Sequence, residues 1–521
     1  MVSKFRKILL INPPAPVRRP YPPFGLLSLA AYLESKNTCL CDIIDFDCLG
    51  LDDLGDLKPI QAPSVERQVS WDEVESYISN ADYDIFGLSL TFSLNFQSTQ
   101  RVASLIRKHH PDSVIVVGGN HTSSMPKQTL EQIPEIDYAI CGEGEKTLTM
   151  LINALKGGTD ISNIPALVHR DSSGQPTDFD GIPQLLEMSE LPFEAIDKIP
   201  IRTYRTIWEY LGYSTHYKCN DPAGYLLSSR GCPYRCIYCS TRVVHGRSFR
   251  PKSAERVFKE MKERYDKYGV RKFGFVDDNF TVSVKRVEKI CDMICAAGWP
   301  EEGVIWSCYS RVNNLTRNLL VKMKAAGCVS LNFGIESGDE KVLEIIKKDI
   351  KLDEVRNALK VTKELGFFRG CNFMVGHWGD TRESVLRTLE FAIEIEPDYA
   401  AFWITTPYPG TELYELAKEK GRMFSDSYGG DLHDLRKTEF KPVYSPPDLE
   451  VDEMVELTIY VRNEYNRRMR AKRALQKLGK ISPILAREGG ILHRALNILA
   501  KTGVLNLIVK LTHFFPRKNR I

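Results

Sequence analysis

The stretch that decides the fold is Ser229–Ser240, which reads Ser-Arg-Gly-Cys-Pro-Tyr-Arg-Cys-Ile-Tyr-Cys-Ser. Its three cysteines follow the spacing C-x3-C-x2-C: Cys232, Cys236 and Cys239. Thiolates are soft ligands that suit iron–sulfur clusters and zinc. A closed zinc site needs a fourth ligand, and the next cysteines, Cys291 and Cys295, lie far along the chain in a predicted helix. Three thiolates on a four-iron cluster leave one iron open to bind another molecule. The alternative is a zinc knuckle or a chance grouping of cysteines.

Bulk composition restricts the class of protein. The 521 residues are enough for two or three domains, and 43% apolar and 26% charged residues are ordinary for a soluble globular protein. The net charge of +3 gives no reason to expect a nucleic-acid partner. Thirteen cysteines without a secretory signal favour a reducing, cytoplasmic and anaerobic setting over a disulfide framework. No uncharged apolar run reaches the roughly 20 residues of a membrane-spanning helix.

Upstream of the cysteines, short apolar strands alternate with amphipathic helices. The predicted strands are Lys7–Asn12, Leu40–Phe46, Asp84–Ser89, Val114–Val117 and Tyr138–Cys141. This alternation predicts a Rossmann-like, doubly wound parallel sheet, whose glycine-rich turns at the carboxyl ends of the strands bind ligands. Thr159–Pro200 is predicted to form a hairpin and a linker.

The same alternation resumes at the cysteine loop. The predicted strands are Ala223–Ser228, Lys272–Val276, Val304–Ser310, Ser330–Ser337, Gly370–Val375 and Tyr399–Thr405. Six repeats are fewer than the eight of a closed TIM barrel and predict a partial (β/α)6 barrel of the TIM type.

The cysteine spacing, the aromatic Tyr238 before the last cysteine and the six repeats resemble the radical S-adenosylmethionine (SAM) superfamily. The resemblance implies a 4Fe-4S cluster on Cys232, Cys236 and Cys239, with the amino and carboxylate groups of SAM on the open iron. It also implies reductive cleavage of SAM to a 5′-deoxyadenosyl radical, with flavodoxin or ferredoxin as the electron donor.

Three segments of the N-terminal half resemble the cobalamin-binding domain that precedes the cluster motif in many radical SAM enzymes: Pro22–Leu26, Gly118–His121 and Cys141–Glu145. The resemblance implies cobalamin contacts from Gly118, Gly119, His121, Gly142, Glu143 and Gly144. One position departs from the pattern, because Asp47 stands where the D-x-H-x-x-G motif has its cobalt-ligating histidine. We therefore expect no histidine below the cobalt. The alternative is a nucleotide-binding or degenerate Rossmann-like domain that binds no cobalamin.

Polar residues at the carboxyl ends of the barrel strands are the candidates for SAM binding. The resemblance assigns Asp277 or Asp278 to the SAM amino group and places Glu336 and Ser337 near the ribose. Arg311 is suited to the SAM carboxylate because a guanidinium donates two parallel hydrogen bonds. Each of these could instead be a surface or helix-capping residue. We interpret Cys308, Cys328 and Cys371 as buried structural thiols.

We divide the chain into a cobalamin-binding domain (1–185), a linker (186–220), a radical SAM core (221–440) and a basic helical C-terminal region (441–521). The last region combines the basic cluster Arg467–Arg473 with an apolar segment, Ile491–Leu511, that polar residues interrupt. This pattern is typical of a helix lying on a membrane surface, here the inner face, and equally of a helical cap packed on the barrel.

The function predicted is cobalamin-dependent radical SAM methylation of an unactivated sp3 carbon, through methylcobalamin. The substrate expected is apolar, for example a hopanoid or another isoprenoid lipid. Two alternatives stay open: a radical SAM cyclase or rearrangement enzyme similar to the anaerobic tetrapyrrole cyclase, and a non-catalytic cobalamin-binding sensor.

Overall fold

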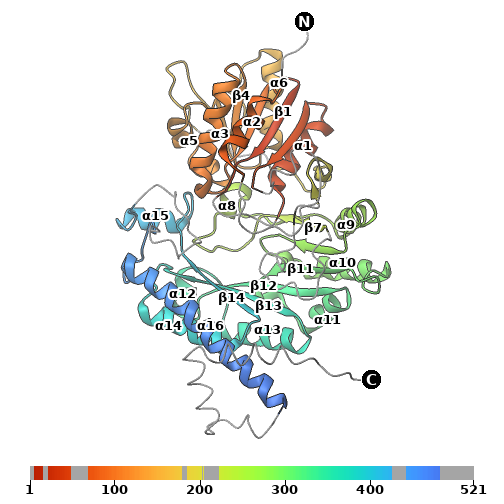
Figure 1. Ribbon diagram of the computed structural model, residues 1–521, viewed down its shortest axis with the longest axis vertical. Coiled ribbons are helices and arrows are strands. Elements are labelled where there is room, and N and C mark those ends of the chain that lie inside the picture. The colour runs from red at the N-terminus through yellow and green to blue at the C-terminus, as the bar shows by residue number, and fades with distance from the viewer. Residues whose placement is uncertain are drawn as a thin grey trace.

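The computed structural model describes residues 5–15, 21–47, 69–178, 185–201, 204, 222–424 and 442–481. Two six-stranded sheets organise this part of the chain, one before and one after the cysteine loop. Figure 1 shows the N-terminal sheet and its helices (red to orange) stacked on the second sheet (green to blue).

The first sheet has the strand order β2-β1-β3-β4-β5-β6. Its strands are β1 (Lys7–Asn12), β2 (Leu40–Asp45), β3 (Ile85–Ser89), β4 (Val114–Gly118), β5 (Tyr138–Ile140) and β6 (Leu167–His169). The helices around it are α1 (Phe24–Ser35), α2 (Trp71–Ser79), α3 (Phe96–His109), α4 (Asn120–Ser124), α5 (Pro126–Gln132) and α6 (Gly144–Gly157), with the 3-10 turn η2 (Ser93–Asn95). Because side chains alternate along β1, Ile8 and Leu10 pack with α1 and α6, whereas Leu9 and Ile11 pack with α2, α3 and α5. The Rossmann-like prediction is confirmed.

One edge of this sheet differs from the prediction. The strand β6, inside the segment expected as hairpin and linker, pairs antiparallel with β5, whereas every other pair in the sheet is parallel. Leu167 and Val168 are buried by this pairing, which covers the outer edge of β5. The sheet is therefore mixed, with one antiparallel edge strand.

The second sheet has the order β14-β13-β12-β11-β10-β7, and all its pairs are parallel. Its strands are β7 (Ala223–Leu226), β10 (Lys272–Phe275), β11 (Ile305–Ser310), β12 (Cys328–Glu336), β13 (Phe368–Val375) and β14 (Tyr399–Ile404). The helices are α9 (Ala254–Tyr268), α10 (Val284–Ala296), α11 (Arg317–Ala325), α12 (Glu340–Ile345), α13 (Leu352–Glu364), α14 (Arg382–Ile395) and α15 (Glu412–Glu419), with turns η3 (Ile196–Lys198), η5 (Phe280–Val282) and η6 (Val312–Asn314). Because β7 and β14 lie at opposite ends of this strand order and do not pair with each other among the described residues, the barrel is partial, as predicted.

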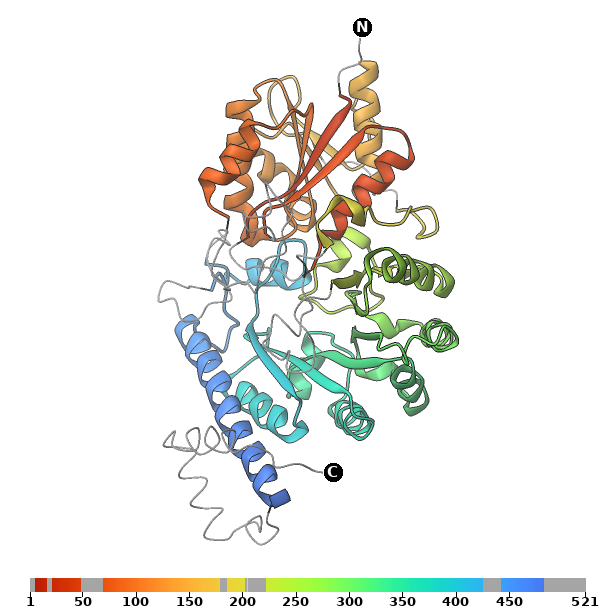
Figure 2. The ribbon, with the colours of Figure 1, turned by 45° about the vertical axis from the view of Figure 1, so that its right-hand side comes forward.

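The long helix α16 (Val451–Ile481) packs along α14 and β14, as both ribbon views show (Figure 2). Several of its basic residues contact the barrel: Arg468 pairs with Glu390 at 2.5 Å, Lys472 pairs with Glu396, and Arg473 donates to two backbone carbonyls. This part of the tail therefore packs on the barrel as a helical cap. The segment Ile491–Leu511, on which the membrane-surface prediction rests, lies outside the described residues. Among the described residues, no helix is both long and apolar enough to cross a membrane.

Candidate active site between the two domains

The cysteine loop is fixed at its base by two short strands. β8 (Ser229–Arg230) pairs antiparallel with β9 (Arg250–Pro251), and the loop between them ends in α8 (Thr241–His245). Gly231 has φ 81°, and a Cβ atom there would lie 2.1 Å from the Ser248 carbonyl oxygen. A side chain at this position would displace backbone, so the turn into Cys232 requires glycine.

The three thiols, Cys232, Cys236 and Cys239, lie on this one loop and are partly exposed. Burial raises the pKa of Cys232 to about 11, and the nearby Asp278, Cys239 and Cys236 add to the shift. Bound iron supplies the positive charge that three neighbouring thiolates need. No three His, Cys, Asp or Glu side chains within the described ranges are arranged to hold a single metal ion. A set of three thiols on one loop suits the larger four-iron cluster. Cys308, Cys328 and Cys371 are buried in the barrel core.

A buried polar group lies beside Tyr238. Lys348 Nζ is 2.9 Å from Glu336 Oε1 and 3.3 Å from the Tyr238 hydroxyl. Glu336 ends β12 with φ 72°, a left-handed conformation that is uncommon for a non-glycine residue. His377, after the end of β13, lies with its ring 4.9 Å from that of Tyr238. Burial lowers the pKa of His377 to about 4, so its imidazole is neutral at pH 7.

The two neighbouring aspartates at the end of β10 differ in their surroundings. Asp277 is buried and accepts hydrogen bonds from the Ser228 N–H at 3.1 Å, the Ser228 hydroxyl at 2.8 Å and the Ser229 hydroxyl. These contacts tie the end of β10 to the start of the cysteine loop. Asp278 is exposed, and its carboxylate accepts a hydrogen bond from Thr241 at 3.0 Å. Of the two, Asp278 is thus the one open to a ligand beside the cysteines.

Arg311 lies against the loop itself. Its Nη1 is 3.6 Å from Cys236 Sγ, and its guanidinium stacks 3.7 Å from the centre of the Tyr234 ring. The Nη2 atom donates to the Lys348 and Asp349 carbonyls. The cation is therefore positioned next to a thiolate ligand of the expected cluster, where it stabilises negative charge on the sulfur.

Ser337 serves the local backbone. Its hydroxyl accepts a hydrogen bond from the Asp339 N–H at 3.1 Å and lies 3.2 Å from the Thr388 hydroxyl. Of the expected ribose pair, Glu336 therefore faces the polar group beside Tyr238, whereas Ser337 shapes the turn into α12.

The predicted cobalamin residues lie where β4 and β5 end. Gly119 has φ 127°, and a Cβ atom there would meet the Leu90 carbonyl oxygen at 2.5 Å, so glycine lets the turn pack against the end of β3. His121 Nδ1 lies 2.7 Å from the Ser93 hydroxyl, and burial lowers the pKa of His121 to about 4. Gly118 ends β4, Gly142 (φ 70°) donates to the Ser123 hydroxyl, and Gly144 begins α6.

The fit to cobalamin rests on the end of the sheet. The buried polar side chains of Ser93, Asn95 and Thr122 follow the carboxyl ends of β3 and β4. Two of their oxygens, Asn95 Oδ1 and Thr122 Oγ1, have no hydrogen-bond partner among the described residues. Polar groups and a glycine turn at this edge suit a ligand with a nucleotide-like tail. Asp47, at the position of the missing histidine, is buried beside Asp45, its N–H donating to Asp45 Oδ1.

The two halves of the site meet through a buried ion network. Arg230, directly before the cysteine loop, pairs with Glu143 at 2.8 Å and with Glu145 at 2.6 Å. Arg250 and His245 also contact Glu143. Glu143, expected near cobalamin, is thus surrounded by Arg230, Arg250 and His245 of the second domain. The helix α4 reaches the same region through Asn120, whose side-chain amide lies 3.5 Å from the Ser240 hydroxyl.

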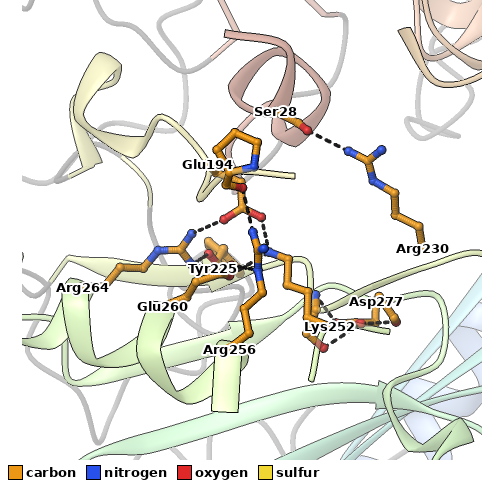
Figure 3. Close-up of polar contacts among 12 residues, drawn as sticks. Ser28, Glu194, Tyr225, Arg230, Lys252, Arg256, Glu260, Arg264 and Asp277 are labelled. Atoms are coloured by element: carbon orange, nitrogen blue, oxygen red, sulfur yellow. Dashed lines mark hydrogen bonds and ion pairs between the residues drawn. The ribbon is translucent and has the colours of Figure 1, made fainter. Parts of the chain in front are cut away.

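A second buried network fixes the segment that joins the domains (Figure 3). Glu194 pairs with Lys252 at 2.5 Å and with Arg264 at 3.0 Å, and Lys252 also pairs with Glu260 at 2.7 Å. The backbone carbonyl of Lys252 accepts a hydrogen bond from Arg286, which also donates to Ser228, a partner of Asp277. These contacts connect the linker to the base of the cysteine loop.

The inner face of the partial barrel is aromatic and polar. Strand register places Tyr309, Asn332, Gly370 and Tyr399 in one row across four strands. Burial, together with the nearby Tyr21 and Tyr399, raises the pKa of Tyr309. Tyr21 comes from the N-terminal domain, and its ring lies 6.2 Å from that of Tyr225 on β7. A side chain of the first domain therefore reaches the lumen of the second.

The sequence reasoning missed three side chains at this site. Lys348 stands beside Lys347, a pattern typical of surface charge, and only the fold shows that it is buried. His377 follows a predicted strand end, which was a usable signal. Tyr21 stands directly before the segment Pro22–Leu26, and nothing in the sequence indicates that its side chain reaches the barrel.

Two protein families match parts of the chain. Residues 226–392 match the Radical SAM superfamily, and residues 15–152 match the B12 binding domain. An uncharacterized methyltransferase of Pyrococcus horikoshii is 31% identical over 420 residues, covering 80% of this chain and 83% of that protein. A cytidylyl-2-hydroxyethylphosphonate methyltransferase of Streptomyces wedmorensis is 26% identical, covering 80% and 83%. An anaerobic magnesium-protoporphyrin IX monomethyl ester cyclase of Rubrivivax gelatinosus is 24% identical, covering 90% and 78%.

Among solved structures, the radical SAM methyltransferase TsrM of Kitasatospora setae, with cobalamin and a [4Fe-4S] cluster bound, has a TM-score of 0.62. The two proteins are 19% identical, and the match covers 80% of this chain and 75% of the TsrM chain. This likeness is therefore evidence for the fold alone. The two matched regions contain the two halves of the site described above. The chain therefore belongs to the radical SAM enzymes that carry a B12-binding domain, with a [4Fe-4S] cluster, SAM and cobalamin as its cofactors.

Proposed function

We propose that this enzyme transfers a methyl group to an unactivated sp3 carbon of an apolar substrate held in the barrel lumen. The observation that carries the proposal is the meeting of the two cofactor domains. Arg230 and Asn120 join the cysteine loop to the B12-binding domain, and Tyr21 of that domain lies near Tyr309 in the lumen. When bound, the cofactors supply a 5′-deoxyadenosyl radical that abstracts hydrogen and a methyl group that replaces it.

The chain's own residues hold and orient these groups. In this proposal Cys232, Cys236 and Cys239 ligate the cluster, and Asp278 accepts hydrogen bonds from the SAM ammonium beside it. Arg311 serves two groups in this proposal. Its Nη1, which lies near Cys236 Sγ, stabilises the Cys236 thiolate in addition to binding the SAM carboxylate. Glu336 and Tyr238 line the side of the site that faces the nucleoside, with Lys348 neutralising Glu336. The network of Asp277 fixes the loop.

In the B12-binding domain, Gly118, Gly119 and Gly142 form the turns against which cobalamin lies, and His121 stays neutral beside Ser93. Glu143 acts through Arg230 on the position of the cysteine loop. Gly144 begins the helix that carries Glu145. The electron donor proposed is a flavodoxin or ferredoxin. Membrane contact through the basic helical C-terminal region (441–521), with its apolar segment Ile491–Leu511, stays a prediction.

A cyclisation of the substrate is the second candidate, because a tetrapyrrole cyclase aligns over 90% of this chain. One experiment separates the two. The reconstituted enzyme is incubated anaerobically with SAM labelled in its methyl group, a reductant and a lipid-soluble cell extract, and products are examined by mass spectrometry. A product that carries the label supports methyl transfer. Formation of 5′-deoxyadenosine with an unlabelled, cyclised product would favour the cyclase.

A further inference from the structure

The helix α16 brings one cation to the free edge of the barrel. Arg462 Nε donates a hydrogen bond of 2.6 Å to the carbonyl oxygen of Phe402, on the edge strand β14. Its guanidinium carbon lies 5.6 Å from the centre of the Trp403 ring. Burial lowers the pKa of Arg462, although the side chain is still partly reachable by solvent. The cation is therefore partly dehydrated and held in place.

Arg462 differs from its neighbours on the same helix. Arg467 pairs with Glu464 and Arg468 pairs with Glu390. Within the described part of the chain, no carboxylate pairs with Arg462, and its only hydrogen bond uses Nε. Both Nη atoms are therefore available to an acceptor. A partly dehydrated guanidinium without an anion is unfavourable, and a bound anion would relieve that cost.

The position of Arg462 relates it to the lumen. Phe402 faces the helices, since its ring lies 5.7 Å from that of Tyr465 on α16. Because side chains alternate along a strand, Tyr399 and Trp403 face the opposite, inner side. Trp403 Nε1 donates a hydrogen bond of 3.2 Å to Oδ1 of Asn372, which lies on the neighbouring strand β13. The guanidinium thus lies at the free edge of β14, next to an inner wall of aromatic and amide groups.

We propose that Arg462 binds an oxyanion of the substrate, a carboxylate or a phosphoryl group, while the apolar body of the substrate lies against Trp403 in the lumen. The proposal rests on the proposed function for the presence of a substrate in the lumen. A guanidinium presents two N–H groups in a plane, which matches the two oxygens of either group. The substrate class is accordingly an amphiphilic acid, with an apolar scaffold and one anionic end.

Binding of matched probes tests this site in the holoenzyme. Decanoate, decyl phosphate and the neutral decanol are titrated calorimetrically into wild type, Arg462→Gln, Arg462→Lys and the control Arg467→Gln. Because a hydrogen bond to an ionised group is stronger than one between neutral groups, Arg462→Gln should weaken binding of at least one acid by roughly tenfold or more. Arg462→Lys should keep part of the affinity, and Arg467→Gln all of it. Decanol should not discriminate among the proteins.

Comparison of decanoate with decyl phosphate shows whether the site prefers a carboxylate or a phosphoryl group. Absence of any acid preference in wild type, or an acid preference that survives Arg462→Gln, overturns the proposal. Equal losses in Arg462→Gln and Arg462→Lys, with decanol affected too, point to a structural role and also overturn it. Labelled methyl in products is scored separately. Acid binding without label transfer would refute only the methyl transfer, and label transfer without acid preference would refute only the role of Arg462.

Discussion

Arg230 and Glu143 form a buried ion pair between the two domains, with Nη1 of Arg230 2.8 Å from Oε2 of Glu143. The side chains are 7% and 3% exposed. Arg230 is separated from Cys232, the first cysteine of the loop, by Gly231 alone. The N-terminal domain therefore holds the chain at the point where it enters the cysteine loop.

Replacing Glu143 by Gln should strongly destabilise the protein. The change leaves Arg230, Arg250 and His245 without their shared anion, and breaking a buried ion pair costs about 3–5 kcal/mol. Urea unfolding followed by circular dichroism measures the difference. The control is Glu75→Gln, because Glu75 is a half-exposed surface partner of Lys108 and His109 whose loss should change stability little. Equal stability of wild type and Glu143→Gln would contradict the prediction.

The same pair predicts a pH dependence. Burial alone would raise the pKa of Glu143, but His245, Arg230 and Arg250 outweigh it and hold this pKa at about 2, below the ordinary 4.5. A lowered folded-state pKa stabilises the fold above pH 4.5, and this stabilisation is lost as pH falls from about 4.5 towards about 2. The free energy of unfolding should therefore fall more steeply with acidification in wild type than in Glu143→Gln. Parallel curves of unfolding free energy against pH for wild type and Glu143→Gln would contradict this prediction.

Serine at Cys232, Cys236 or Cys239 should remove the cluster, since a hydroxyl is a poor iron ligand. We expect loss of the iron–sulfur absorption and of the reduced-state EPR signal, with SAM cleavage at background. Cys295→Ser, which changes an exposed thiol on α10, is the matched control and should retain all three. An intact EPR signal in any of the loop variants would remove that cysteine from the ligand set.

Asp277 and Asp278 should respond differently to replacement by Asn. Asp278→Asn should raise the KM for SAM roughly tenfold by weakening one charge-assisted hydrogen bond, with stability unchanged. Asp277→Asn should lower stability by about 1–3 kcal/mol, because the hydrogen bonds to Ser228 and Ser229 lose their anionic acceptor. Kinetics of SAM cleavage and thermal unfolding together separate these outcomes. The reverse pattern would assign the SAM contact to Asp277.

Alanine at Gly119 should impair cobalamin binding while the cluster still assembles. The added Cβ would meet the Leu90 backbone at 2.5 Å in a conformation that L-residues rarely adopt, so the turn must shift. Bound cobalamin, read from its visible spectrum after gel filtration, should fall severalfold or more. Gly157→Ala in α6, where a Cβ makes only an ordinary contact, is the control. Unchanged cobalamin content in Gly119→Ala would place the ligand elsewhere.

Local patterns were sufficient to predict the parallel strands of both sheets and the cysteine loop. Lys7–Asn12 was predicted with the bounds that it has, and all six barrel strands were found, because apolar runs between turn residues are local signals. The pairing of β6 was missed, since three residues carry too little pattern to reveal which edge they join.

The candidate site was harder to predict where its contacts span the chain. Glu143 and Arg230 are 87 residues apart, and nothing in either segment indicates that they pair. Likewise, Arg462 looks like a member of a basic helix until the edge of β14 is placed beside it. Only the fold distinguishes a fully solvated cation from a partly buried one.

The position of Tyr21 has a consequence for how such an enzyme can change its preferences. This ring belongs to one domain and helps to bound the interior of the other, near Tyr225 and Tyr309. The volume offered to a reacting molecule is thus set partly by how the two domains pack against each other. Substitutions where they meet, as at Tyr21, can widen or narrow the reaction chamber while both six-stranded sheets keep their strand order.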